Sequence, residues 1–278
     1  MMENKKGILY LVPTPIGNME DITYRALKIL NEVDVIFCED TRVSKELLNY
    51  YKIKKNLISS NEQNENKRIE LLLNYLNSNQ NVAIITDRGT PIISDPGYIL
   101  VKKAIEENCE IVALPGANAA TTALIISGLN PYPYIFYGFL KGNNKKKIEN
   151  LKFLKNIKYT MIFYESVHHL KDTLNLIYSV FGNRKIAICR ELTKVYEECV
   201  RDDLENIINN FDNIILKGEF VIVVEGNKTE IDYSDLDLVE HVGMYISDGL
   251  DKMEAIKQTS KDLKLSKSEV YKKYHEGN

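Results

Sequence analysis

The sequence lacks the short motifs that mark several large classes of enzyme. Its 14 glycines never stand two residues apart, so it has no G-x-G-x-x-G fingerprint for a dinucleotide, and it has no G-x-x-x-x-G-K-S/T phosphate loop. It also has no Gly-x-Ser-x-Gly turn, which would raise a nucleophilic serine above a sheet. These absences argue against dinucleotide-dependent dehydrogenases, P-loop enzymes and serine hydrolases, and they favour a ligand that is held by loops.

Cysteine and histidine are too few and too scattered to build a metal site. The cysteines are Cys38, Cys109, Cys189 and Cys199. No two of them have C-x-x-C spacing, and three lie in or beside apolar strands, so we expect reduced, buried thiols rather than disulfides or zinc ligands. Two of the four histidines, His168 and His169, are adjacent, and helical geometry would point them in different directions. We therefore expect no bound metal ion.

Long hydrophobic runs are also missing. The apolar runs are only as long as strands, and no N-terminal stretch joins a basic head to a long apolar segment, so we expect neither a membrane span nor a signal peptide. With 278 residues, 44% of them apolar and 27% charged, the chain can form one large or two medium domains with a proper core. A folded cytoplasmic protein with no membrane contact is the simplest expectation.

Positive and negative charges nearly balance over the whole chain but not locally. The net charge of −3 gives no global signal for a polyanion-binding protein. Between Lys141 and Lys158, however, seven lysines stand against the single acid Glu149. A charge run is usually a solvated face, but it can also form an electrostatic footprint for phosphates.

Apolar runs and helical periodicities alternate along most of the chain. The pattern predicts strands at 7–12, 34–38, 57–58, 82–85 and 110–114 with helices between them, which is typical of a parallel, doubly wound sheet. A second series of strands is expected at 134–140, 159–165, 185–191 and 218–225. We therefore predict two α/β domains, residues 1–117 and 118–229, followed by a small helical C-terminal extension, residues 230–278.

The C-terminal extension is expected to begin with an acidic linker and to continue as helix. Asp251-Lys252-Met253-Glu254 and Ser266-Lys267-Ser268-Glu269 are capping-box patterns, which predict short helices over 251–263 and 267–274. The two could form a helix-turn-helix. Because this tail holds slightly more acids than bases, a small helical cap is favoured over a DNA reader.

The stretch from Thr86 to Gly97 is the strongest candidate for a binding site. It follows the apolar run 82–85, and it contains two Gly, two Pro and two Asp, which form neither helix nor sheet but do form a tight, rigid turn. Open α/β sheets bind ligands beyond the carboxyl ends of their strands. A plain connecting loop is the alternative for an isolated Gly-Thr-Pro, yet twelve such residues in a row indicate a small-molecule site. Small residues at 118–127 permit either a ligand or tight helix packing.

The segment Asp87-Arg88-Gly89-Thr90-Pro91-Ile92-Ile93-Ser94-Asp95-Pro96-Gly97 closely resembles the signature of a small-subunit ribosomal RNA methyltransferase family of the tetrapyrrole methylase superfamily. Further motifs agree in order: Thr14-Pro15-Ile16-Gly17-Asn18, Glu39-Asp40-Thr41-Arg42, Pro115-Gly116, Phe163-Tyr164-Glu165-Ser166, Arg190-Glu191-Leu192-Thr193-Lys194 and Gly218-Glu219-Phe220. The resemblance runs from about residue 9 to 226. The chain departs from it at Arg88, where Ala is usual, at Asn61, where His is usual, and at Ala117-Asn118, where Pro-Ser is usual.

The resemblance implies S-adenosylmethionine as methyl donor, bound in a cleft between the two α/β domains without a metal. The residues expected to bind it are Thr14, Gly17, Asp87, Gly89, Thr90, Pro91, Ser94, Asp95, Ala119, Ala120 and Tyr164. It further implies methyl transfer to the ribose 2′-hydroxyl of a cytidine in the decoding region of 16S rRNA, within the small ribosomal subunit, by a homodimer.

Five charged residues in these motifs are candidates for catalysis and substrate contact: Asp40, Arg42, Glu165, Arg190 and Lys194. The carboxylates are candidate bases and the cations are candidate anchors for phosphates beside the target sugar. Each could instead belong to an ion pair at a domain interface. Two other functions stay open: a methylase of corrin-like small molecules, and a non-catalytic RNA-binding protein on the same fold.

Overall fold

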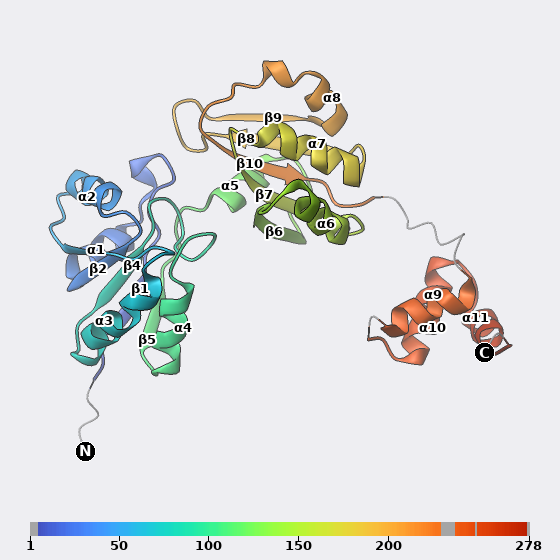
Figure 1. The fold of residues 1–278 in the computed structure, drawn as a ribbon, viewed down its shortest axis with the longest axis horizontal. Coiled ribbons are helices and arrows are strands. Elements are labelled where there is room, and N and C mark those ends of the chain that lie inside the picture. The colour runs from blue at the N-terminus through green and yellow to red at the C-terminus, as the bar shows by residue number, and fades with distance from the viewer. Residues whose placement is uncertain (1–4, 229–236, 248, 277–278) are drawn as a thin grey trace. The chain divides into compact units, whose positions relative to one another are not determined.

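The computed structural model describes residues 5–228, 237–247 and 249–276 (Figure 1). The chain forms two compact units, Met1–Asn227 and Lys228–Asn278. The first unit contains two five-stranded sheets and the second contains helices.

The first sheet is entirely parallel, as expected. Its strands are β1 (Ile8–Leu11), β2 (Val35–Cys38), β3 (Asn56–Ser59), β4 (Val82–Ile85) and β5 (Glu110–Ala113). They lie in the order β3-β2-β4-β1-β5. Every residue of β2 and β4 is buried, because helices cover both faces of a parallel sheet and leave no polar face.

Helices on the two faces of this sheet separate its core into two clusters. The helices are α1 (Tyr24–Glu32), α2 (Thr41–Tyr50), α3 (Glu65–Asn77) and α4 (Tyr98–Glu106), with the short 3-10 turn η1 (Met19–Asp21) before α1. Ile36 and Cys38 pack with α1 and α2, whereas Val35 and Phe37 pack with α3 and α4. Successive strand residues point to opposite faces, so one apolar run supplies both cores.

The second sheet is mixed, with the order β6-β7-β10-β8-β9. Its strands are β6 (Tyr134–Phe139), β7 (Thr160–Ser166), β8 (Lys185–Arg190), β9 (Glu198–Asp203) and β10 (Glu219–Val224). Only β6 and β7 are parallel; β10 runs antiparallel to β7 and β8, and β8 antiparallel to β9. Four of these strands were expected. The edge strand β9 was not, because its sequence ECVRDD is mostly polar.

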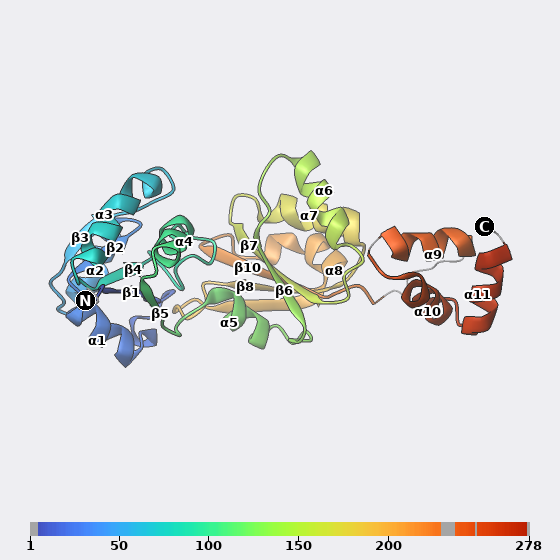
Figure 2. The same ribbon diagram turned by 90° about the horizontal axis from the view of Figure 1, so that it is seen from below.

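Helices also cover both faces of the second sheet (Figure 2). On one face lie α6 (Asn144–Leu154), α7 (Leu170–Phe181), α8 (Leu204–Asn209) and the turn η2 (Phe211–Asn213). On the other lies α5 (Ala119–Ile126), whose Ala120 and Ala123 are buried against the sheet. The small residues of this helix therefore do serve tight packing, at these two positions.

The four cysteines are free thiols, as expected. Cys38, Cys109 and Cys189 are buried, and Cys199 is partly exposed. Cys189 and Cys199 are direct partners across β8 and β9, with their Sγ atoms 3.2 Å apart. Among the described residues, no group of three or more His, Cys, Asp and Glu side chains is placed to hold a metal ion.

The second unit contains α9 (Leu238–Ser247), α10 (Lys252–Asp262) and α11 (Lys267–Glu276) around a small apolar core. Asp251 caps α10 through the N–H groups of Met253 and Glu254, and Ser266 and Glu269 bond to each other's backbone N–H at the start of α11. Both expected helices are confirmed, while α9 was not expected. The acidic linker falls mainly on residues 229–236, which lie outside the described residues. None of the described helices is long and apolar enough to cross a membrane.

Candidate active site

The loop between β4 and α4, residues 86–97 (the central loop), is fixed at both ends by hydrogen bonds. Near its start, Thr14 and Gly89 exchange two backbone hydrogen bonds of 2.9 and 3.0 Å. At its end, the buried Glu65 carboxylate accepts the N–H groups of Gly97 and Ile99, both at 3.0 Å. The loop is thus held by its neighbours in the fold, which is what a preorganised binding site requires.

The central loop also contains unusual backbone conformations. Gly89 and Gly97 have φ of 87° and 124°, but Ile92 and Ser94 have φ of 75° and 71° as well. A β-branched residue at positive φ is a rare outlier, and such strain costs on the order of 1–3 kcal/mol per residue and gathers at functional sites. The surrounding structure therefore forces this loop into a shape that its sequence alone does not prefer.

Three carboxylates gather where the central loop meets the end of β2. Burial, and then the charges of Glu39 and Asp87, raise the pKa of Asp95 to about 7. Burial, and then the charge of Asp87, raise the pKa of Glu39, and burial together with the charge of Asp40 raises the pKa of Asp87. The Thr86 hydroxyl donates to Glu39 at 3.1 Å, and the Asp40 N–H donates to Asp87 at 3.1 Å. This acidic cluster (Glu39, Asp87 and Asp95) favours a cation in its vicinity.

Aromatic side chains and the start of α5 face the cluster from the second sheet. Tyr164 lies edge-on between Phe136 and Phe139, with ring centres 5.0 and 5.5 Å away, and burial raises its pKa to about 12. Asn118 caps α5 by accepting the Thr121 N–H at 3.2 Å, so it serves as the serine of the related signature would.

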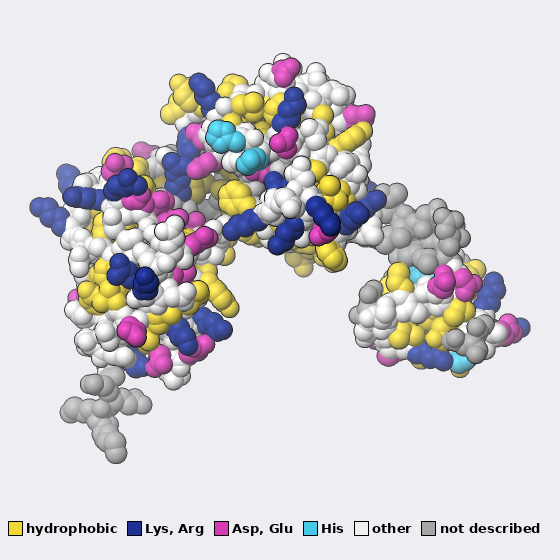
Figure 3. Space-filling view, viewed as in Figure 1, with side chains coloured by type: hydrophobic (Ala, Val, Ile, Leu, Met, Phe, Trp, Pro, Cys, Tyr) yellow, Lys and Arg dark blue, Asp and Glu magenta, His cyan; other side chains and the backbone are white. Residues whose placement is uncertain are grey.

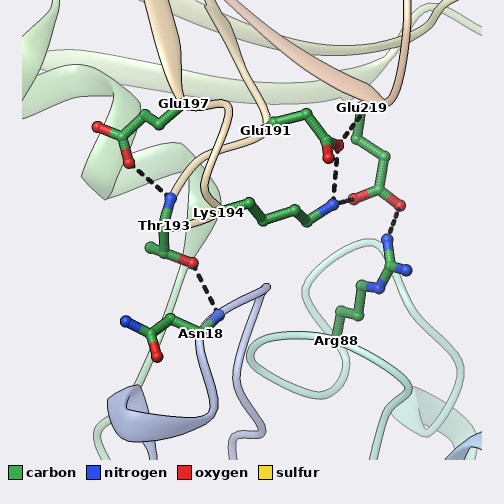
Figure 4. A network of polar contacts seen from close by, with 7 residues as sticks. All are labelled: Asn18, Arg88, Glu191, Thr193, Lys194, Glu197 and Glu219. Carbon is green, nitrogen blue, oxygen red and sulfur yellow. Dashed lines mark hydrogen bonds and ion pairs between the residues drawn. The ribbon is translucent and has the colours of Figure 1, made fainter.

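A network of ion pairs joins the central loop to the second sheet (Figure 4). Arg88 contacts Glu219 at 2.5 Å, while the Lys194 ammonium lies 2.8 Å from Glu191 and 3.7 Å from Glu219. The Glu219 N–H also donates to Glu191 at 3.2 Å. Beside this network, Thr193 accepts the N–H of Asn18 at 3.1 Å.

Two glycines make this network possible. A Cβ on Gly17 would lie 2.4 Å from Cγ of Lys194, and a Cβ on Gly218, whose φ is 84°, would lie 2.1 Å from the carboxylate of Glu191. Neither position tolerates a side chain without displacing its neighbour. Gly17 is thus a support for Lys194 in this structure.

These elements enclose a cavity of about 570 Å³. The predicted residues that line it are Asp87, Gly89, Thr90, Ser94, Asp95, Ala119, Tyr164, Glu165 and Lys194. Glu165 is buried and accepts the Thr173 hydroxyl at 2.6 Å and the Ser166 N–H at 2.8 Å. The carboxyl ends of β4 and β7 thereby meet at one site.

The other predicted site residues lie around the cavity without lining it: Thr14, Gly17, Pro91, Ala120, Asp40, Arg42 and Arg190. Asp40 caps α2 and pairs with the exposed Arg42 at 2.7 Å, and Arg42 holds the pKa of Asp40 at about 2. Arg190 is buried and bonded to Glu198 of β9 at 3.1 Å. The Asp40–Arg42 ion pair therefore lies at the start of one helix, and the Arg190–Glu198 pair lies within one sheet.

Several cavity residues were not among the predicted ones, including Glu39, Thr86, Arg88, Glu191 and Glu219. Glu39, Arg88, Glu191 and Glu219 stand inside the quoted motifs, and Thr86 directly precedes one of them. Because strand side chains alternate between faces, a one-residue shift separates Arg190 from Glu191. The pairing of β10 with β8, which brings Glu219 to Glu191, has no local signal.

A family model described as Tetrapyrrole (Corrin/Porphyrin) Methylases matches residues 8–208. The chain therefore belongs to the tetrapyrrole methylases, a family that uses S-adenosylmethionine. The match extends over the first sheet and over β6, β7, β8 and β9 of the second.

Individual relatives narrow this class. The chain is 46% identical over 275 residues, covering 97% of it and 94% of the relative, to the Ribosomal RNA small subunit methyltransferase I of Bacillus subtilis (strain 168). It is 45% identical over 276 residues, covering 98% and 96%, to the protein of that name from Halalkalibacterium halodurans.

Solved structures with the same fold carry other names. A diphthine synthase matches with a TM-score of 0.64 at 15% identity, over 79% of this chain and 90% of that one. The uroporphyrin-III C-methyl transferase of Thermus thermophilus, complexed with S-adenyl homocysteine, matches with a TM-score of 0.57 at 16% identity, over 78% and 97%. At these identities the likeness shows the fold.

Proposed function

We propose that this chain is an S-adenosylmethionine-dependent methyltransferase that methylates the ribose 2′-hydroxyl of a cytidine in the decoding region of 16S rRNA. The near full-length identity to the two bacterial rRNA methyltransferases supports the substrate class. The observation that carries the chemistry is the cavity of about 570 Å³, which brings the central loop, α5 and β7 together at the carboxyl ends of their strands.

The residues around the cavity fit the proposed donor. When bound, S-adenosylmethionine supplies an electrophilic methyl group on a cationic sulfonium. The acidic cluster gives the cavity a negative side suited to such a cation. Gly89 and Ala119 line the cavity with little or no side chain and so leave room for the donor. A Cβ on Gly89 would lie 3.2 Å from the side chain of Ile16, which also lines the cavity. We assign the donor to the predicted set, with Thr14, Gly17, Pro91 and Ala120 supporting it from behind.

The charged candidates then divide by position. Glu165 faces the cavity, and Thr173 and Ser166 fix its orientation, so it is our candidate to accept the hydroxyl proton or to position its acceptor. Asp40, with a pKa of about 2, binds a proton far less readily than Asp95. Lys194 presents a cation at the cavity, suited to an adjacent phosphate. Arg42, paired with Asp40, is exposed and can contact RNA outside the cavity, whereas Arg190 orders β9 through Glu198.

Two measurements test this proposal. Ribose-methylation mapping of 16S rRNA from cells with and without the protein should show one cytidine that loses its 2′-O-methyl group. Purified protein should transfer a labelled methyl group to unmethylated small subunits. A small-molecule corrin methylase would leave the map unchanged, and a non-catalytic RNA-binding protein would show no donor binding by calorimetry.

We further propose a homodimer, because large apolar side chains stay exposed on the first unit, among them Ile125 and Tyr132, which are 75% and 82% exposed. Interfaces are enriched in aromatic side chains. Light scattering at micromolar concentration should give about twice 31.9 kDa. A mass near 31.9 kDa would remove this part of the proposal.

A further inference from the structure

The basic segment from Lys141 to Lys158 lies next to the cavity. A hollow of about 380 Å³ adjoins it and shares Ser94 and Phe139 with it. A second hollow, of about 520 Å³, shares Lys146 and Asn150 with the first and continues to Phe153. The cavity and the two hollows therefore form one continuous path, which we call the α6 track.

Local backbone geometry brings the track to the central loop. β6 contains an irregularity between Phe136 and Gly138, and Gly138 has φ of 76°. A Cβ on Gly138 would lie only 3.2 Å from Oγ of Ser94, so this glycine lets β6 approach the central loop closely. Asn143 then caps α6 by accepting the Lys146 N–H at 3.0 Å. The helix thus starts beside the first hollow.

The lysines along the track are exposed and carry no partner of opposite charge. Lys141, Lys145 and Lys146 are all exposed, and within the described ranges none of the seven lysines from 141 to 158 forms an ion pair. Lys and Arg side chains gather over α6 in the space-filling view (Figure 3). The lysines of the track thus differ from Lys194, which is paired with Glu191 and Glu219.

Aromatic rings stand at both ends of the track. Phe139 is 43% exposed where the cavity meets the first hollow, and Phe153 is 82% exposed at the far end. Lys146, Asn150 and Phe153 are spaced i, i+4 and i+7, so they share one face of α6. Cations alternating with exposed aromatic rings are typical of surfaces that hold single-stranded nucleic acid through phosphates and stacked bases.

We propose that the α6 track binds the single-stranded RNA segment next to the nucleotide whose ribose enters the cavity. This rests on the proposed function, since the track leads out of the methyltransferase cavity. Lys141, Lys145 and Lys146 contact phosphates, and Phe139 and Phe153 stack on bases. Unpaired lysines can contact phosphates while the neighbouring rings stack on bases, so the combination favours RNA.

The test is the salt dependence of binding to a short, fluorescently labelled poly(U), followed by anisotropy. Each phosphate contact adds about 0.7 to the slope of log affinity against log salt for single strands. The triple variant Lys141→Gln, Lys145→Gln, Lys146→Gln should therefore lower the slope by about 2, and Lys146→Gln alone by about 0.7. The substituted side chains are exposed, and melting curves check that the fold is kept.

The matched control is Lys54→Gln, Lys67→Gln, Lys102→Gln. These lysines are also exposed and without an ion pair in the described structure, and they lie on the first sheet's loops and helices. The change in net charge is the same, so the slope should stay near the parental value. A parental slope in the Lys141, Lys145, Lys146 variant, or an equal loss in the control, would overturn the track.

Stacking has its own variant. Phe153→Ala should weaken poly(U) binding roughly 5-fold or more at an unchanged salt slope, while Tyr24→Ala, at a side chain that is 94% exposed on α1, should not. Equal affinity of both variants would refute the stacking contact. If the parental protein binds poly(U) through the track but transfers no methyl group to small subunits, the proposed function fails and the track stands; the reverse result removes only the track.

Discussion

The two sheets of the first unit contribute opposite properties to one cavity. The parallel sheet presents a strained, hydrogen-bonded loop and the acidic cluster of Glu39, Asp87 and Asp95. The mixed sheet presents aromatic rings, the Lys194 network and, beyond it, the unpaired lysines of α6. A cationic methyl donor suits the first side and a polyanionic acceptor suits the second. The difference teaches that the unpaired positive charge lies beyond the cavity, along α6, whereas carboxylates from both sheets line the cavity itself.

The largest effect is expected from filling the cavity at the start of α5, which faces the acidic cluster. Ala119→Leu places a bulky side chain at a residue that lines it, and overpacking of this kind costs about 1–3 kcal/mol, or roughly 5- to 150-fold in donor affinity. Calorimetry with S-adenosylhomocysteine measures the loss. Thr121→Leu, at an exposed position of the same helix, is the control and should bind nearly as the parent does. Equal affinity of the two would place the donor elsewhere.

A smaller effect is expected on the mixed-sheet side. Lys194→Met leaves the carboxylates of Glu191 and Glu219 without their shared cation. Leaving such groups unpaired lowers the free energy of unfolding by about 1–3 kcal/mol where they are fully buried, and by less at these partly exposed positions. The two negative charges then repel RNA phosphates, so kcat/KM for small subunits should fall while donor affinity stays. Lys217→Met, exposed in the same region, should change neither. A loss of donor affinity instead would contradict the division between the sides.

The acidic cluster should make donor binding depend on pH. The pKa of Asp95 is about 7, so its negative charge appears as pH rises through that value, and affinity for the cationic donor should rise a few-fold over that range. The neutral product S-adenosylhomocysteine should respond less. Asp95→Asn should flatten the donor curve. If the dependence of donor affinity on pH is unchanged in this variant, Asp95 is not its cause.

The same pKa has a consequence for folding. The folded chain holds a proton that the unfolded chain releases at a lower pH, so the stability gained from this site at acid pH is lost as pH rises through about 7. Asp95→Asn should therefore raise the melting temperature more at alkaline than at acid pH, because Asn never carries the unfavourable charge. Thermal melts at both pH values give the comparison.

The smallest effect is expected at the link between the two sides. Arg88 and Glu219 are 52% and 66% exposed, and exposed ion pairs contribute at most about 1 kcal/mol. Arg88→Ala introduces the residue that is usual at this place in the resembled signature. It should lower the free energy of unfolding by no more than about 1 kcal/mol. Urea unfolding measures it. A larger loss would mean that Arg88 orders the central loop.

Much of the fold could be predicted because its signals are local. The buried runs Val35–Cys38 and Val82–Ile85 are continuous apolar strands, and the alternation with helices fixes a parallel sheet. β9 was missed because an edge strand needs no apolar run. The antiparallel placement of β10 between β7 and β8 depends on contacts with strands far away in the sequence, which no local pattern carries.

The candidate site shows the same limit. The motifs that surround Asp87, Ala119 and Glu165 lead to residues that do line the cavity, since strand ends and loop turns place them there. Arg190 belongs to the same motif as Glu191, yet it pairs with Glu198 on a strand that the sequence did not predict. Which of two neighbouring charges faces a site depends on strand register, and register is set by pairing partners.

The positive φ of Ile92 and Ser94 has a consequence for how this chain could be engineered or could drift. Glycine at either position would relieve backbone strain in the folded state, although it would also enlarge the conformational freedom of the unfolded chain. Where the relief of strain is larger than this entropic cost, selection for heat resistance alone would favour glycine at these positions of the central loop. Variants selected in this way would gain thermal tolerance and lose catalytic turnover, because a looser loop no longer holds its shape without ligand.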